Sequence, residues 1–81
     1  MSDADLLARI VHDPGILGGK PVIEGTRLSV EYILNLLAHG ESAEGIIAEY
    51  PGVTTDDVRA CLLFATRTLE STAFLPTPVG A

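Results

Sequence analysis

The sequence predicts a mainly α-helical fold, in which a short N-terminal β-hairpin is followed by three helices. Two observations lead to this prediction. A run rich in glycine and proline at residues 13–27 separates two short β-prone segments. From residue 29 onward, apolar residues recur at helical spacing. We therefore assign residues 1–71 of the 81 to a single domain, with a hairpin region at 9–28 and three helices at 29–71.

Backbone requirements shape the hairpin region. Residues 13–27 contain four glycines, which permit positive φ, and two prolines, which fix φ at about −65°. We expect a strand over 9–12 that a turn at Asp13-Pro14-Gly15 stops, and a second strand over 20–23. A third short extended piece is expected over 26–28.

Two short stretches flank these strands. Residues 2–9 are expected to be a polar start with one small apolar cluster. Gly25-Thr26-Arg27 is a glycine turn followed by a hydroxyl and a cation. This tripeptide either anchors the start of the next helix or holds Arg27 out for a carboxylate, and both interpretations stay open.

The first two predicted helices each have a capping residue and a stop signal. Ser29 begins the first helix, which ends at Gly40. Ser42 begins the second, which ends at Pro51-Gly52. Gly45 weakens the second helix by up to about 1 kcal/mol relative to alanine, so we expect its stability to come from packing. Apolar residues follow the helical repeat in both: Val30, Ile33, Leu34 and Leu37, then Ala43, Ile46, Ile47 and Tyr50.

A third helix is predicted over 55–71, with Thr54 or Thr55 as its N-cap. Leu63 and Phe64 widen its apolar stripe, so we expect this helix at the centre of the core. The rest of the apolar face consists of Val58, Cys61, Leu62, Ala65 and Leu69. Residues 72–81 contain two prolines and are predicted to form an extended C-terminal tail, ordered only against a partner.

Composition excludes several classes of protein. The net charge of −6 opposes a strongly basic nucleic-acid-binding surface. The lone Cys61 excludes an internal disulfide, and no zinc-ligand spacing occurs. No stretch approaches the ~20 apolar residues of a membrane span, and the acidic N-terminus opposes a secretory signal, so we expect a cytoplasmic protein. Because 47% of the residues are hydrophobic, more than a core of this size uses, we expect a homodimer.

Nucleotide-binding and catalytic patterns are incomplete. Gly18-Gly19-Lys20 resembles the end of a phosphate-binding loop, but Pro14 and Pro21 stand where that loop needs a glycine and a hydroxyl. His12 and Asp13 are the nearest acid–base pair, yet neighbours on a strand point to opposite faces. We therefore expect no enzyme, no cofactor and no metal site.

Residues 43–71 have the proportions of a helix-turn-helix, with a glycine in the turn. In this interpretation the third helix enters a DNA major groove. Asp56 and Asp57 at its start oppose that role because they repel phosphates, and any two packed helices with a short loop share these proportions. The residues available for DNA are Lys20, Arg27, Thr55 and Arg59.

Two stretches of the chain match the pattern of a known family. The first is Asp13-Pro14-Gly15-Ile16-x-Gly18-Gly19-Lys20-Pro21-Val22-Ile23-x-Gly25-Thr26-Arg27-Leu28-x-Val30. The second is Gly40-x-Ser42-x-Glu44-x-Ile46, Tyr50-Pro51-Gly52-Val53-Thr54 and Asp57-Val58-Arg59-Ala60-x-Leu62. Over about residues 9–66 they resemble the signature of the DUF433 family. The resemblance implies a homeodomain-like helix-turn-helix protein with a short N-terminal strand region.

The same resemblance implies a partner. Many members look like antitoxins of type II toxin–antitoxin pairs, matched to a PIN-like ribonuclease toxin whose site is a carboxylate cluster around a divalent metal. We therefore expect a dimeric antitoxin that blocks such a site, with Arg67, Phe74 and Leu75 as its toxin contacts. Two alternatives remain, a DNA-binding transcriptional regulator without a toxin and a simple dimerisation module.

Overall fold

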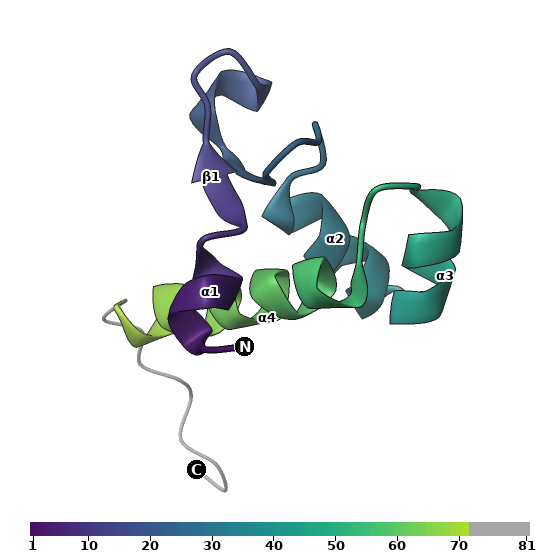
Figure 1. The fold of residues 1–81 in the computed structure, drawn as a ribbon. Helices are drawn as coiled ribbons and strands as arrows, with labels where there is room; N and C mark the ends of the chain where they lie inside the picture. Colours follow the sequence, from purple (N-terminus) through teal and green to yellow (C-terminus); the bar gives the residue numbers. More distant parts are fainter. Residues whose placement is uncertain (72–81) are drawn as a thin grey trace, which may run out of the picture.

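The computed structural model describes residues 1–71, and the tail predicted for 72–81 lies outside the described residues. Figure 1 shows a hairpin that rises from a layer of helices, with α4 along the base of that layer. The predicted class, mainly α with a short N-terminal β-hairpin, is confirmed. The elements in order are α1 (Asp3–Leu7), β1 (Ile10–His12), the 3-10 turn η1 (Leu17–Gly19), β2 (Pro21–Ile23), α2 (Val30–Ala38), α3 (Ala43–Glu49) and α4 (Thr55–Glu70).

The two strands pair with each other inside the chain. β1 and β2 are antiparallel, with Ile10 opposite Ile23 and His12 opposite Pro21. The turn between them runs through η1, where Gly18 and Gly19 have φ of 66° and 85°, values that glycine adopts without steric cost. The third extended piece expected over 26–28 is not a strand, because only an isolated bridge from Val22 to Ser29 forms there.

Thr26 anchors the chain where it leaves the hairpin. Its hydroxyl donates to the carbonyl oxygen of Ile23 over 2.8 Å and accepts from the backbone N–H of Leu28 over 3.0 Å. Of the two interpretations of Gly25-Thr26-Arg27, structural anchoring is therefore the role that Thr26 has.

The three long helices begin where the sequence predicts. The side chains of Ser29, Ser42 and Thr54 accept the backbone N–H of the residue three positions later. In α4 the cap is reciprocal, because Asp57 Oδ2 also accepts the N–H of Thr54 over 2.9 Å. Each cap satisfies N–H groups that a helix start would otherwise leave unpaired, which explains why local sequence sets these boundaries.

The polar start with one apolar cluster expected at 2–9 contains a helix that the sequence did not predict, since residues 3–7 form α1. Ser2 and Asp5 make a capping box over its first turn, and Leu6 is buried in the core. Figure 1 shows α1 lying against α4. A helix this short is marginal alone, so its packing against α4 is what stabilises it.

The core lies between the hairpin, α2, α3 and the inner face of α4. Two residues expected on the buried face of α4 are instead exposed: Leu62 to 48% and Leu69 to 64%. The arc of α4 that the other elements cover includes Val58, Ala60 and Cys61, and both leucines lie outside that arc. The buried apolar residues are Leu6, Ile10, Val22, Ile23, Val30, Ile33, Ile46, Val53, Val58, Ala60 and Cys61.

Within residues 1–71, no helix is both long and apolar enough to cross a membrane.

Candidate partner-binding surface

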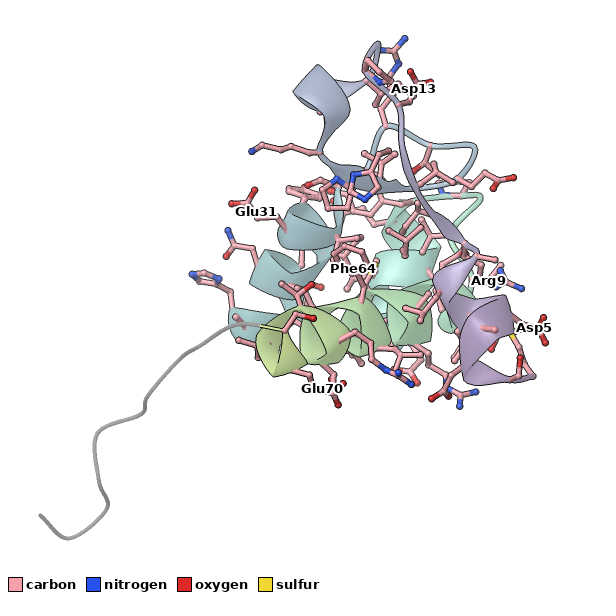
Figure 2. All side chains as sticks on the ribbon, turned by 90° about the vertical axis from the view of Figure 1, so that its left-hand side faces the viewer. Asp5, Arg9, Asp13, Glu31, Phe64 and Glu70 are labelled. Atoms are coloured by element: carbon pink, nitrogen blue, oxygen red, sulfur yellow. The ribbon has the colours of Figure 1, made fainter. Side chains whose placement is uncertain are left out.

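An apolar groove lies where the hairpin, α2 and the C-terminal half of α4 meet. Figure 2 shows Phe64 in the angle between the hairpin and the helices, with Glu31 to one side and Glu70 below. The hollow has a volume of about 390 Å³. We call it the α2–α4 groove, and it is lined by Pro21, Val30, Glu31, Leu34, Phe64, Ala65, Thr68 and Leu69.

Three elements position the walls of this groove. Ser29 caps α2, so that Val30 and Leu34, four residues apart, present the same side of that helix. Phe64 comes from α4, and its ring centroid lies 6.3 Å from that of His12 on β1. Because the walls are almost entirely apolar, the groove suits an apolar segment of a partner rather than a charged ligand.

Arg67, a predicted toxin contact, lies in the last turn of α4. Its Nη2 is 2.7 Å from Asp3 Oδ2 in α1, and its Nε is 4.0 Å from Glu70 Oε2. The guanidinium is therefore already held by carboxylates of its own chain. Phe74 and Leu75, the other predicted toxin contacts, lie outside the described residues.

Lys20 and Arg27, two of the four predicted DNA contacts, share one hollow. It has a volume of about 460 Å³ and is also lined by Leu17, Leu28, Ser29 and Tyr32. Lys20 Nζ is 3.1 Å from Glu31 Oε1. Arg27 is exposed, and no hydrogen bond or ion pair engages its guanidinium within residues 1–71. This surface therefore presents an available cation beside apolar side chains.

The other two predicted DNA contacts lie elsewhere, on α4. Thr55 is exposed in the first turn of that helix, and Arg59 Nη1 is 3.7 Å from Asp56 Oδ1. Arg59 lines a different hollow, of about 310 Å³, together with Asp3 and Leu6 of the α1 region. The structure thus divides the predicted DNA contacts between two places.

Sequence reasoning missed the pair of Arg9 and Asp57. Arg9 Nη1 is 3.0 Å from Asp57 Oδ1, and the Asp57 side chain is only 8% exposed. Arg9 Nη2 also lies 3.9 Å from Asp56 Oδ2. A capping role for Asp57 could be read from its place three residues after Thr54, but no local signal points to an arginine so distant in the chain.

Cys61 is enclosed within α4, as its apolar surroundings predict. Burial, with the nearby negative charge of Asp57, raises the pKa of the Cys61 thiol to about 12. A protonated thiol is a poor nucleophile and a poor metal ligand. Among residues 1–71, no group of three or more His, Cys, Asp or Glu side chains is arranged to hold a metal ion.

The fold and this surface define a small, mainly α domain with an apolar groove and an N-terminal hairpin. A match to the family described as "Protein of unknown function (DUF433)" covers residues 10–65. The chain belongs to the DUF433 family.

Two known proteins are similar to this chain. The "Uncharacterized protein y4eO" of Sinorhizobium fredii (strain NBRC 101917 / NGR234) is 32% identical over 56 residues, which are 69% of this chain and 25% of that protein. The chain thus matches only a quarter of that relative's length. The crystal structure of a DUF433 member from Anabaena variabilis ATCC 29413 superposes with a TM-score of 0.73 at 28% identity, over 83% of this chain and 66% of that one.

Proposed function

We propose that this protein is a cytoplasmic antitoxin that binds and neutralises a PIN-like ribonuclease toxin. One observation carries the proposal: the apolar α2–α4 groove opens along the C-terminal half of α4, with Leu34, Phe64 and Leu69 among its walls. A binding protein needs such a surface, whereas an isolated domain gains nothing from leaving it open to water. The type of partner is what resemblance to the family implies.

In this proposal the groove accepts an apolar segment of the toxin, and cations of the antitoxin pair with the carboxylates of its metal site. Arg67 is engaged by Asp3, but both side chains are about half exposed or more. Such surface ion pairs contribute about 0–1 kcal/mol, so Arg67 can exchange Asp3 for a toxin carboxylate at small cost. Arg27 needs no exchange, since no partner holds it within residues 1–71.

The groove is tested by placing a charge in it. Thr68 is exposed and lines the groove, so Thr68→Lys introduces a cation there without opening a cavity. Asn35→Lys on the exposed side of α2 makes the same change of charge outside the groove and is the matched control. Each variant is co-expressed with the reading frame next to its gene, and toxin capture and growth rescue are measured.

We expect Thr68→Lys to weaken toxin capture at least tenfold and to abolish rescue, while Asn35→Lys retains both. Arg27→Ala, Arg67→Ala and deletion of residues 72–81 test the cations and the tail in the same assay. If the wild-type chain neither captures nor neutralises the neighbouring gene product, the antitoxin function is wrong. If the wild-type chain neutralises the toxin and Thr68→Lys changes neither capture nor rescue, the toxin binds outside the α2–α4 groove.

Operator binding is a second candidate, favoured by Lys20 and Arg27 in one hollow and by the order of α3 and α4. Phosphate contacts make DNA affinity fall steeply with salt, by about one counterion for each contact. We expect Lys20→Ala and Arg27→Ala each to reduce the slope of log affinity against log salt concentration by about one. Promoter binding that is undetectable with and without the toxin removes this candidate.

A further inference from the structure

The outer face of α4 is apolar and uncovered in the described chain. Leu62 and Leu69 are seven residues apart, so they lie on one side of the helix, with Thr66 between them. We call these three residues the outer stripe. The stripe is a ridge between two hollows, because Leu69 also borders the α2–α4 groove while Leu62 and Thr66 border the hollow beside Asp3 and Leu6.

The polar group in this stripe is already satisfied. The Thr66 hydroxyl donates to the carbonyl oxygen of Leu62 over 3.1 Å. Burying the stripe would therefore leave no unpaired donor, and its cost in polar desolvation is small. This favours a protein partner over a major groove, whose phosphates and base edges need donors and cations.

The charges beside the stripe identify the occupant. Arg59 and Glu70 lie about three helical turns apart, so they flank the stripe on the same side, one near each end. A two-fold axis between Phe64 and Ala65 that reverses the helix direction brings each residue opposite its counterpart. Arg59 of one copy then meets Glu70 of the partner subunit, and the contact occurs twice.

The same axis also interleaves the apolar side chains. Along the helix, the partner's Leu62 lies at a level between Thr66 and Leu69 of the first copy. By symmetry, Leu62 of the first copy lies between the same two residues of the partner. The ion pairs that Arg59 and Glu70 make in their own chain are long, 3.7 Å and 4.0 Å, and exposed. Pairs of this kind contribute little and yield readily to a new partner.

We propose that a second copy of this chain docks on the outer stripe, so that two α4 helices pair antiparallel about an axis between Phe64 and Ala65. This dimer leaves the hairpin strands paired within each chain. It does not depend on the proposed antitoxin function, because the purified chain alone forms it.

The experiment is analytical ultracentrifugation of the full chain and of matched variants, with circular dichroism to check folding. Leu62→Glu places a charge in the stripe but outside the α2–α4 groove, and Leu17→Glu makes the same change at the hairpin turn, where Leu17 is 51% exposed. We expect a wild-type dimer whose dissociation constant rises at least a hundredfold in Leu62→Glu and stays unchanged in Leu17→Glu.

Charge reversal tests the antiparallel register. Arg59→Glu and Glu70→Arg each bring like charges together twice, so each weakens the dimer about tenfold. The double variant restores opposite charges and recovers wild-type affinity. Within one chain these residues are too far apart to touch, so the rescue can come only from contact between copies.

Every outcome bears on the proposal. A monomeric wild-type chain, or a dimer that persists in Leu62→Glu, overturns it. Loss of the dimer in both single charge variants without rescue in the double variant overturns the antiparallel register. A monomeric wild-type chain that loses toxin capture in Leu62→Glu assigns the stripe to the toxin instead.

Discussion

At the scale of single residues, Cys61 shows how burial sets chemistry. Its side chain is fully enclosed, with 0% exposure, and burial with the charge of Asp57 raises its pKa to about 12 from 9.0. The folded protein therefore keeps the thiol protonated under conditions in which an unfolded chain would ionise it. Cys61 acts as a small core residue.

We expect alkylation of Cys61 to be slow in the folded protein and fast in denaturant. The folded state holds the thiol proton more tightly than the unfolded state, so this residue's contribution to stability is intact below pH 9 and is lost as the pH rises from 9 to about 12. Urea unfolding followed across that range, with Cys61→Ala as the reference, measures the loss. Rapid labelling of the native chain would contradict a buried thiol.

At the scale of elements, a tyrosine pair joins α2 to α3. The hydroxyl oxygens of Tyr32 and Tyr50 are 2.5 Å apart, and their rings meet edge to face at 86°. The hydrogen bond from Tyr32, followed by desolvation, raises the pKa of Tyr50 to about 12 from 10.0. These are the only two tyrosines of the chain, so the pair can be observed directly.

We expect phenolate absorbance to show one tyrosine ionising at about pH 12, and Tyr32→Phe to return Tyr50 towards its ordinary pKa of 10.0. Because the folded state holds this proton more tightly, the contribution of Tyr50 to stability is complete below pH 10.0 and falls as the pH rises towards 12. Circular dichroism on the same samples separates ionisation from unfolding. An unchanged Tyr50 titration in Tyr32→Phe would show that the bond does not form in solution.

At the scale of the whole molecule, Asp57 ties the N-terminal segment to α4. Its Oδ2 accepts the N–H of Thr54 over 2.9 Å, and its Oδ1 accepts from Arg9 over 3.0 Å. Both carboxylate oxygens are thus engaged although the side chain is nearly buried. The same residue begins α4 and fixes the chain between α1 and β1 against it.

We expect Asp57→Ala to lower the free energy of unfolding by about 2–3 kcal/mol, because it removes a helix cap and leaves Arg9 without its buried partner. Asp57→Asn retains an acceptor for the Thr54 N–H, so we expect it to lower the free energy of unfolding by less than Asp57→Ala does. The control is Asp56→Ala, whose carboxylate is more exposed and more distant from Arg9, and whose cost should stay below about 1 kcal/mol. Equal losses at positions 56 and 57 in urea unfolding would refute this role.

The boundaries of α2, α3 and α4 could be predicted because their signals are local. A serine or threonine satisfies N–H groups only a few residues away, and the apolar repeat begins directly after it. α1 lacks such independence, since its five residues become a helix only against α4. Arg9 could not be paired with Asp57 because contacts between distant residues leave no local pattern.

In the candidate sites too, the sequence indicated single residues but not their contacts with distant parts of the chain. The cations at positions 20, 27, 59 and 67 could be chosen from their charge, but the sequence could not show that Lys20 and Arg27 share a hollow. Nor could it show that Arg67 is held by Asp3. The groove around Phe64 was not predicted, since its walls come from the hairpin and two helices.

By itself, the sequence determined the fold class, the three long helices and the family, because caps, glycine turns and apolar periodicity act over a few residues. The tertiary structure alone decided which arc of α4 is covered. The apolar residues of that helix occupy most of its circumference, so periodicity could not separate the core face from the one carrying Leu62 and Leu69. Only the packing of α1, α2, α3 and the hairpin around α4 makes that distinction and leaves the outer stripe exposed.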